Sequence, residues 1–262
     1  MVLIDKVSCI GCGNCVGDCV GNVLSLDDGK AVYAGQCIQC GHCVAICPTN
    51  SVSIPEYDMA DIEEYNEDSF KVSGDKLLRA IKFRRSIRRF KEQKIERKKL
   101  EAMVQAGRYS ATGSNMQKCG FVFVQHELDT LKDMVWSGIE QAVKSDAADD
   151  NRMLTAMKGF VSMRKETGVD FLFRNAPCVL YITADSPLDA GLAAQNMEMI
   201  AVSQGLGILY NGFLQRSTPL NPEACKWLGM SDSPIQACML VGYPEVTYKR
   251  TVPRKTADVI WK

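Results

Sequence analysis

Eight of the twelve cysteines of this 262-residue chain fall in two runs with the same spacing, C-x2-C-x2-C-x3-C. They are Cys9, Cys12, Cys15 and Cys19 in the first run, and Cys37, Cys40, Cys43 and Cys47 in the second. Each cysteine of the second run lies 28 positions after its counterpart, which indicates a duplicated unit. Thiolates three residues apart on a tightly curled loop can reach three corners of one 4Fe-4S cubane, and the fourth corner must be ligated from elsewhere. The sequence therefore predicts iron-sulfur clusters.

A zinc knuckle also uses C-x2-C pairs and is the alternative interpretation. Zinc needs only four ligands and normally has its two pairs separated by a longer spacer, so the spacing favours iron and sulfide. His42 lies between two of the cysteines, but cysteine fills all eight ligand positions, and we interpret His42 as a surface side chain. The other four cysteines lie in or beside apolar segments and are expected to be small buried side chains: Cys119, Cys178, Cys225 and Cys238.

The two runs resemble the bacterial ferredoxin domain that carries two 4Fe-4S clusters. This resemblance implies crossed ligation, with Cys9, Cys12, Cys15 and Cys47 on one cluster and Cys37, Cys40, Cys43 and Cys19 on the other. Gly11, Gly13 and Gly41 fit it, because a residue without Cβ lets the backbone wrap closely and aim amides at the sulfurs. The proline expected after the last cysteine is present as Pro48, whereas Val20 follows Cys19.

A basic cluster, RRSIRRF at residues 84–90, has the chemistry to bind a phosphate group. Guanidinium groups grip phosphate through two hydrogen bonds, and a serine hydroxyl adds a third. A solvated helix face is the alternative for such a charge cluster. Three other motifs follow in order: SATGSNMQ at 110–117, RNAP at 174–177 and QGLG at 204–207.

These motifs resemble those of FMN-dependent nitroreductases, whose opening signature is R-x-S-x-[RK]-x-[FY] and whose second loop is A-P-S-x-x-N-x-Q. Ala111 stands where that loop usually has proline. The resemblance implies an α/β/α sandwich and an obligate homodimer, in which the loop of Thr112 and Asn115 reaches the flavin of the neighbouring subunit. It implies these FMN-binding residues: Arg84, Arg85, Ser86, Arg88, Ala111, Thr112, Gly113, Asn115, Gln117, Gln204, Gly205, Leu206, Gly207 and Arg254.

The elements that must position these residues mix helices and strands. Apolar residues at helical spacing occur at 77–81 and 100–104, and a long apolar helix is expected over 188–204. Short apolar runs at 120–124, 178–182 and 237–241 predict buried strands. We expect an α+β protein with a ferredoxin-like domain at 1–55, an acidic linker at 56–75 and a flavin domain at 76–262.

Composition sets limits on partners and location. Lysine plus arginine and aspartate plus glutamate both total 31, and no basic run offers a local exception, so nucleic acid is not an expected partner. No apolar run is long enough to span a bilayer and no signal peptide is visible at the start, so we expect a cytoplasmic protein without a membrane partner.

A flavin accepts one or two electrons, whereas a 4Fe-4S cluster passes one electron at a time. A chain with both groups is therefore predicted to convert a supply of single electrons into a two-electron reduction. We expect electrons from ferredoxin or a similar low-potential donor to reach FMN, which reduces a small acceptor such as a nitroaromatic, a quinone or an activated alkene. No catalytic side chain is predicted, because the flavin performs the chemistry. Two alternatives stay open: an NAD(P)H-oxidising flavoenzyme that exports electrons through its clusters, and a non-catalytic electron carrier or redox sensor.

Overall fold

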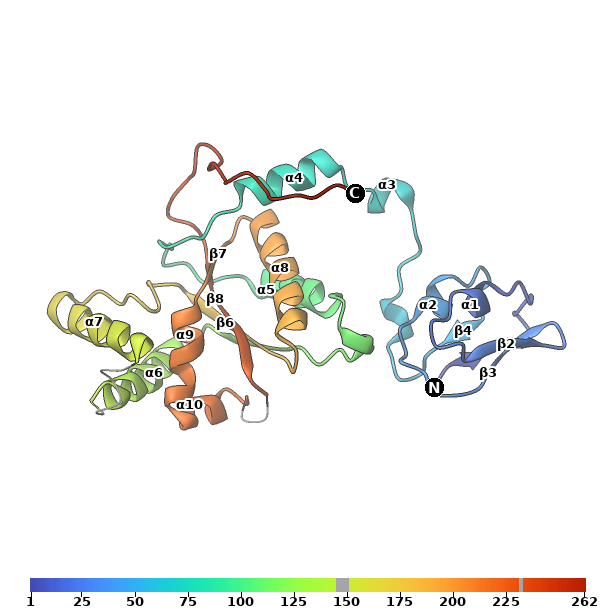
Figure 1. The fold of residues 1–262 in the computed structure, drawn as a ribbon, viewed down its shortest axis with the longest axis horizontal. Helices are drawn as coiled ribbons and strands as arrows, with labels where there is room; N and C mark the ends of the chain where they lie inside the picture. Colours follow the sequence, from blue (N-terminus) through green and yellow to red (C-terminus); the bar gives the residue numbers. More distant parts are fainter. Residues whose placement is uncertain (145–150, 231–232) are drawn as a thin grey trace. The chain divides into compact units, whose positions relative to one another are not determined.

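The computed structural model describes residues 1–144, 151–230 and 233–262. The chain forms two compact units. Unit 1 comprises residues 1–71 together with 112–116, and unit 2 comprises 72–111 together with 117–262. Figure 1 shows both units along the chain.

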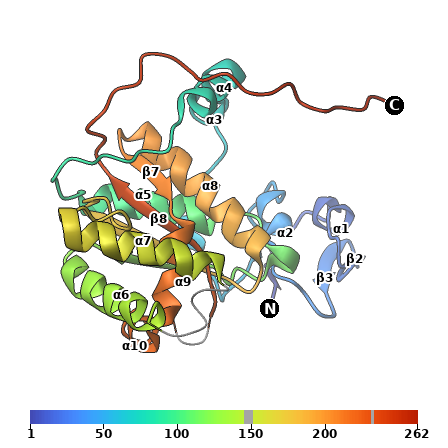
Figure 2. The same ribbon diagram turned by 60° about the vertical axis from the view of Figure 1, so that its left-hand side comes forward.

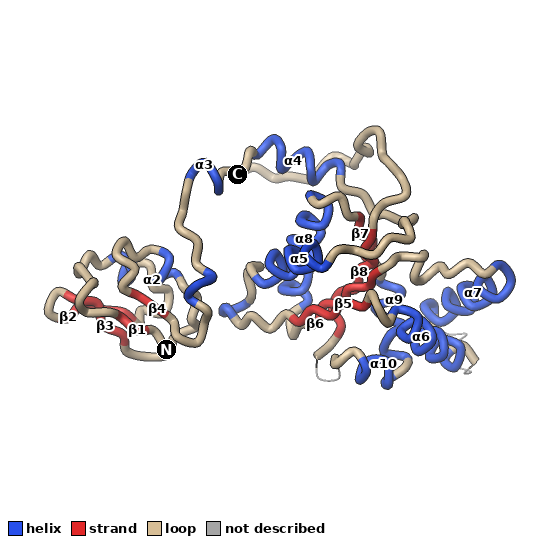
Figure 3. Tube along the Cα trace, turned by 180° about the vertical axis from the view of Figure 1, so that it is seen from behind, coloured by secondary structure: helices blue, strands red, loops and turns tan. Residues whose placement is uncertain are grey.

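Unit 1 is built on two small antiparallel pairs, drawn as arrows in Figure 1 and in red in Figure 3. Strand β1 (Leu3–Ile4) pairs with β4 (Val52–Ser53), and β2 (Leu24–Asp27) pairs with β3 (Lys30–Tyr33). The β2–β3 turn consists of Asp28 and Gly29, both with positive φ, at 48° and 67°, which is the backbone of a tight hairpin turn.

Two one-turn helices carry the duplicated cysteine runs of unit 1. Helix α1 (Asn14–Gly17) follows Gly13 and helix α2 (His42–Ala45) follows Gly41, and both glycines have φ 78°. The repeat seen in the sequence is therefore a structural repeat. Its apolar core includes Val2, Leu24, Ala31, Val52 and Ile54 together with several of the cysteines.

The acidic segment 56–75 contains local structure that its charge pattern did not predict. A 3-10 helix η1 (Met59–Asp61) begins after Asp58, whose carboxylate accepts a hydrogen bond from the Ala60 N–H at 3.0 Å. Helix α3 (Glu67–Phe70) begins after Asn66, whose amide oxygen accepts from the Ser69 N–H at 3.1 Å. These caps give a polar, solvated segment defined turns without a hydrophobic core.

Unit 2 is organised around an antiparallel sheet that has, among the described residues, the order β5-β6-β8-β7. The strands are β5 (Gly120–Val124), β6 (Cys178–Thr183), β7 (Gly207–Tyr210) and β8 (Ile235–Gly242). All six residues of β6 are buried, because helices cover both faces of the sheet. This confirms the predicted α+β class and the strand predictions in β5, β6 and β8.

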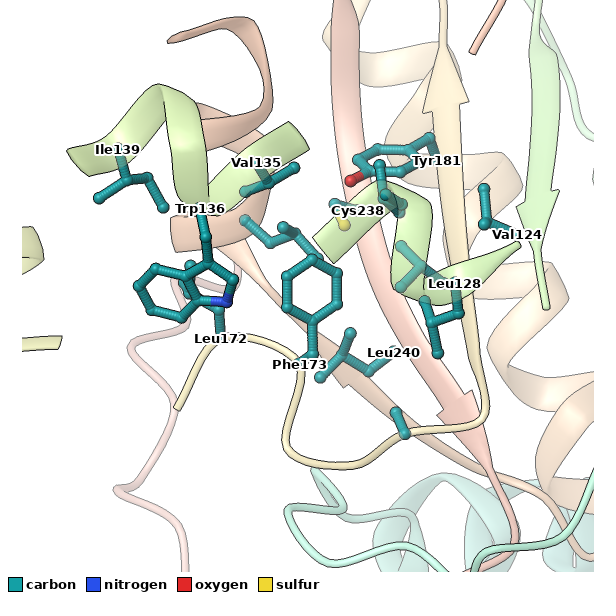
Figure 4. Packing of buried hydrophobic residues seen from close by; sticks show 14 of the residues in the cluster. Val124, Leu128, Val135, Trp136, Ile139, Leu172, Phe173, Tyr181, Cys238 and Leu240 are labelled. Atoms are coloured by element: carbon teal, nitrogen blue, oxygen red, sulfur yellow. The ribbon is translucent and has the colours of Figure 1, made fainter. Parts of the chain in front are cut away.

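Side chains of β6 alternate between two cores. Val179 and Tyr181 lie in the core shared with α6 (Leu128–Ala142), α7 (Arg152–Thr167) and α9 (Gly212–Ser217). Figure 4 shows part of this core, with Trp136 and Phe173 packed beside the sheet. Leu180 and Ile182 lie in the opposite core with α5 (Arg97–Arg108) and α8 (Pro187–Ser203), the helix predicted at 188–204. Figure 2 shows the helices on the two sides of the sheet.

Two segments of unit 2 expose apolar residues. Helix α4 (Gly74–Phe83) has no buried residue, and its Leu77, Leu78 and Ile81 are 46%, 53% and 48% exposed. The C-terminal tail from residue 251 has no regular structure and exposes Val259, Ile260 and Trp261.

Other short helices of the described residues are η2 (Gly113–Asn115), η4 (Thr218–Leu220) and α10 (Pro222–Trp227). Within the described residues, no helix combines the length and apolarity needed to cross a membrane.

Candidate functional site

Four cysteines of the two runs meet at one cavity in unit 1. Cys9, Cys12 and Cys15 of the first run line it together with Cys47, the last cysteine of the second run. Its remaining walls include Gly11, Gly13, Thr49 and Ser51. The structure therefore brings together the four cysteines that crossed ligation assigns to one cluster, although Cys15 and Cys47 are 32 positions apart in the sequence.

Backbone amides point at the sulfurs of this cavity. The Ala31 N–H donates to Cys9 Sγ at 3.5 Å, and the Ser51 N–H donates to Cys47 Sγ at 3.3 Å. These bonds favour a thiolate: amides of Ala31 and Gly11 lower the pKa of Cys9, and the pKa of Cys47 is lowered although burial opposes it. Burial raises the pKa of Cys15. A cavity lined by four cysteines, with backbone amides that donate to two of the sulfurs, fits an iron-sulfur cluster.

Gly11 is required by the fold of this cavity. Its φ is +67°, and a Cβ at this position would lie 2.0 Å from the Gly29 carbonyl oxygen. The β2–β3 turn thus rests directly on the first cysteine loop, and any larger residue would force the two apart.

The second run forms a matching loop. The Gln39 N–H donates to Cys37 Sγ at 3.2 Å, and the pKa of Cys43 is raised by burial and by the nearby thiols of Cys37 and Cys40. Cys19 follows α1 and packs in the same unit 1 core. Beside it, the Asp18 carboxylate lies 3.0 Å from His42 Nδ1, both side chains being largely exposed, as expected for His42. Within the described ranges, no three potential ligands gather at a point that would hold a single metal ion.

The basic cluster of unit 2 lies along the sheet edge. Ser86 bridges Ile208 of β7, and the Ile87 N–H donates to the Ile208 carbonyl at 2.9 Å. Ile87 is buried, and a Cβ on Gly207 would lie 2.3 Å from its Cγ1. This close approach explains the glycine at position 207 and fixes the backbone that carries the arginines.

Arg84 is paired with a buried carboxylate. Its Nη1 donates to Glu198 Oε1 at 3.0 Å, and the Glu198 side chain on α8 is only 1% exposed. Burial raises the pKa of Glu198, and Arg84 opposes that shift. Tyr210 of β7 lies beside this pair, and burial followed by the Glu198 charge raises its pKa. The sequence did not predict this partner for Arg84, because Glu198 lies within an apolar helix with nothing local to mark its contact.

Arg88 and Arg174 belong to two segments that meet at the end of β8. Both Phe90 and Pro177 lie against Gly242, where a Cβ would be 2.9 Å from Phe90 Cδ1 and 2.6 Å from Pro177 Cδ. This contact brings the two arginine-bearing segments to the same end of β8. Burial and the Arg88 charge lower the pKa of Arg174, and across the described residues neither arginine forms an ion pair.

Arg174 is held in place by its backbone and by an aromatic ring. Its φ is 50°, in the left-handed region that non-glycine residues seldom adopt, and its guanidinium lies 4.0 Å from the centroid of the Phe171 ring. Asn175 also has positive φ, at 54°. The RNAP motif stands out in the sequence, but Arg174 was not predicted as a site residue. The signal that could have found it is an arginine immediately before a buried strand, within a motif of its own.

The loop motif 110–117 is divided between the two units. Ser110, Ala111 and Gln117 belong to unit 2, where Ser110 Oγ accepts a hydrogen bond from Asn196 Nδ2 at 2.8 Å. Thr112, Gly113 and Asn115 belong to unit 1. There the Asn115 amide donates to the backbone of the second cysteine loop, so any flavin contact by Asn115 would have to use its carbonyl oxygen.

The remaining predicted residues lie in a turn and in the tail. Gly205 has φ +78°, Leu206 is buried, and the Gln204 carbonyl accepts from Lys99 Nζ at 2.9 Å. Arg254 is exposed in the tail. Arg85 is partly buried on the segment that lies along β7.

Comparison with protein families separates the chain into two known parts. A family model described as the nitroreductase family matches residues 81–243, which is more than half of the chain. The chain belongs to the nitroreductase family. A second model, a 4Fe-4S dicluster domain, matches residues 1–65. The predicted fusion is confirmed: a nitroreductase-family domain and a 4Fe-4S dicluster domain are joined in one chain.

Solved structures support the same fold for the nitroreductase part. A nitroreductase with bound FMN from Bacteroides fragilis is 21% identical, covers 71% of this chain and 98% of its own, and has a TM-score of 0.58. An FMN-bound nitroreductase from Desulfitobacterium hafniense is 21% identical, with 70% and 98% covered and a TM-score of 0.56. An FMN-dependent nitroreductase from Clostridium difficile is 19% identical, with 71% and 100% covered and a TM-score of 0.51. No curated protein matches the chain.

The nitroreductase domain contains groups that fit a flavin phosphate. The Arg88 charge acts on Arg174, and an anion bound by both guanidinium groups would relieve this repulsion. Arg84 can hold Glu198 and still donate elsewhere, since a guanidinium has five N–H donors. These residues match the chemistry of an anionic ligand better than that of a neutral one.

Proposed function

We propose that this nitroreductase passes single electrons from a low-potential protein donor such as ferredoxin through two 4Fe-4S clusters to FMN, which then reduces a small acceptor. The observation that supports this most is the cavity where Cys9, Cys12, Cys15 and Cys47 meet, in the same chain as a nitroreductase domain. A bound flavin would accept single electrons one after another and would then pass two electrons to the acceptor. Nitroaromatics, quinones and activated alkenes are the acceptor classes proposed.

The protein's own residues bind and tune these groups. We propose crossed ligation, with Cys19 completing the site of Cys37, Cys40 and Cys43. Amides of Ala31, Ser51 and Gln39 donate to cysteine sulfurs, and such bonds set a cluster's reduction potential. None of the twelve cysteines forms a disulfide in the structure, which fits a reducing compartment such as the cytoplasm.

We propose that the FMN phosphate and ribityl chain are held by the basic segment 84–88, with Arg174 as an added cation. The loop residues 111–117, the turn 204–207 and Arg254 are proposed as further contacts. Isoalloxazine chemistry needs no acid or nucleophile from the chain, so these residues bind and orient.

A homodimer is the proposed assembly. Leu77, Leu78 and Ile81 present a continuous apolar face on α4, since residues three and four positions apart lie on one side of a helix. The tail adds the exposed side chains of Ile260 and Trp261. A second copy of the chain would bury these apolar surfaces, which agrees with the requirement for a neighbouring subunit at the flavin site.

Stopped-flow reduction distinguishes the proposed direction of electron flow from its reverse. The oxidised protein is mixed anaerobically either with a reduced ferredoxin or with NADPH, and cluster and flavin absorbances are followed separately. We expect ferredoxin to reduce the clusters first and FMN next. Reduction of FMN by NADPH followed by reduction of the clusters would instead support a flavoenzyme that exports electrons. Reduction of FMN without turnover of any nitroaromatic, quinone or alkene would support an electron carrier or redox sensor.

A further inference from the structure

Asn115 directs its amide donors at the second cysteine loop. Its Nδ2 donates to the carbonyl of Ile38 at 3.0 Å and to the carbonyl of Gln39 at 2.9 Å, and it lies 3.4 Å from the Tyr57 hydroxyl. All of these residues belong to unit 1. A residue from a flavin-loop motif thus holds the peptide groups next to Cys37.

The held turn has a backbone that glutamine does not favour. Gln39 has φ 52°, in the left-handed region, where a side chain with a Cβ is strained. Asn115 itself has φ 55°, but asparagine tolerates this region better than most residues. The strained turn at Gln39 therefore needs an outside contact to keep its shape.

The first cysteine loop has a different residue at the corresponding left-handed position. Position 11 is the counterpart of position 39 in the 28-residue repeat, and there the chain has glycine, with φ +67°. Glycine adopts this backbone without strain, so the first loop has no strained residue at this position. The second loop has glutamine in place of that glycine, and it has Asn115 as a support.

The supported peptide carries a hydrogen bond to a cluster ligand. The Gln39 N–H donates to Cys37 Sγ at 3.2 Å. Hydrogen bonds to ligand sulfur stabilise the more negative, reduced form of a cluster and raise its reduction potential. A change in the Gln39 peptide orientation would weaken this bond.

We propose that Asn115 is a positioning residue that sets the reduction potential of the second cluster by holding the Gln39 N–H on the Cys37 sulfur. This inference rests on the proposed function, because it requires a cluster at Cys37, Cys40 and Cys43. It gives Asn115 a role in the iron-sulfur domain that the flavin-loop resemblance does not assign.

An EPR-monitored redox titration of the loaded protein tests this. The second cluster is identified as the signal lost in Cys40→Ala. In Asn115→Ala, the ratio of reduced to oxidised second cluster at a fixed potential should drop about tenfold. For a one-electron couple, this drop corresponds to a reduction potential that is lower by about 59 mV. The first cluster should keep its potential. Tyr57→Phe, which leaves both carbonyl contacts intact, should change neither.

Rescue separates positioning from general damage. Because glycine adopts the backbone of this turn without strain, adding Gln39→Gly to Asn115→Ala should restore the potential of the second cluster. The potential should then be the same in Gln39→Gly and in the Gln39→Gly/Asn115→Ala double variant. If Asn115→Ala does not load clusters, Asn115→Ser is titrated in its place, with the same rescue. Equal shifts of both clusters, no shift, or no rescue would overturn the proposal. Failure of the proposed function would be seen earlier, as wild-type protein without iron and sulfide.

Discussion

Arg84 and Glu198 form an ion pair at 3.0 Å in which the carboxylate is almost fully buried. This pair joins the start of the basic segment 84–88 to α8, so the proposed flavin site and the core of the nitroreductase domain share a residue. Removing one member of a buried pair leaves the other charge unpaired, which costs more than the pair itself contributes.

Arg84→Ala should therefore have two effects. FMN retention should weaken by about 2–3 kcal/mol, the scale of a lost charge-assisted hydrogen bond, while cluster content stays unchanged. The apoprotein should also lose about 3–5 kcal/mol of unfolding free energy, because the buried Glu198 carboxylate loses its cationic partner. Dialysis followed by flavin analysis checks the first effect, and chemical denaturation checks the second. Full flavin retention after dialysis would show that the motif has been aligned wrongly with the phosphate.

The stability loss in Arg84→Ala should depend on pH. Burial raises the folded-state pKa of Glu198 above its ordinary value, and without Arg84 that pKa rises further. The folded state then binds more protons than the unfolded state, so stability falls as pH increases from the ordinary glutamate pKa through the raised one. We expect Arg84→Ala to be closer to wild type at acid pH than at neutral pH. The Arg84→Ala/Glu198→Gln double variant should lose this pH dependence.

Arg174→Gln tests whether the two unpaired arginines bind the flavin phosphate. Titration of the apoprotein should show about tenfold weaker FMN binding, the effect of about 1.4 kcal/mol. Riboflavin, which lacks the phosphate, should bind equally to both proteins. Arg89→Gln is the matched control, because Arg89 is already paired with Glu245 at 2.9 Å on the surface. Equal losses for FMN and riboflavin would contradict a phosphate contact.

Gly11→Ala should remove one cluster and spare the other. The added Cβ would meet the Gly29 carbonyl oxygen at 2.0 Å, and backbone cannot move aside as a flexible side chain can. Iron and sulfide should fall from about eight each per chain to about four. Gly41→Ala is the control: its Cβ meets nothing within 4 Å, so it carries only the left-handed backbone penalty of about 1–2 kcal/mol. Full cluster content in Gly11→Ala would contradict the cavity as described.

The strands and long helices could be predicted because their signal is local. The runs in β5, β6 and β8 are each continuous in apolar residues over about five positions, and α8 is mostly apolar along its length. Strand β7 was not predicted, since its first residue, Gly207, was interpreted as the end of the flavin turn 204–207 and its other three residues were not interpreted. The two-residue strands β1 and β4 are too short to leave a periodic pattern.

The site contacts that could not be predicted join residues far apart in the sequence. Glu198 is 114 positions from Arg84, and Asn115 is 76 positions from Gln39. Neither residue type nor spacing reveals such partners, because the contacts depend on how complete elements pack. The cysteine set differs, since the resemblance of its duplicated motif to two-cluster ferredoxins implies the crossed arrangement from the sequence alone.

Leu78→Glu on α4 should disrupt the proposed homodimer and with it the flavin sites. A charge placed on an apolar interface is desolvated only at a large free-energy cost, so light scattering should show monomers that have lost FMN. Lys82→Glu, also exposed on α4 but a charge exchange at an already charged position, should stay dimeric. A stable wild-type monomer with bound FMN would contradict the proposed assembly.

Rapid mixing of reduced ferredoxin with cluster variants measures directly whether the clusters deliver electrons to FMN. In Cys12→Ala and in Cys40→Ala one cubane loses a ligand, so ferredoxin-driven FMN reduction should fall steeply, while direct reduction by dithionite persists. Cys225→Ala, a cysteine of α10 outside both runs, should behave like wild type. Flavin content and dimer size confirm folding in each variant. Unchanged ferredoxin-driven reduction in both Cys12→Ala and Cys40→Ala would contradict electron delivery through the clusters.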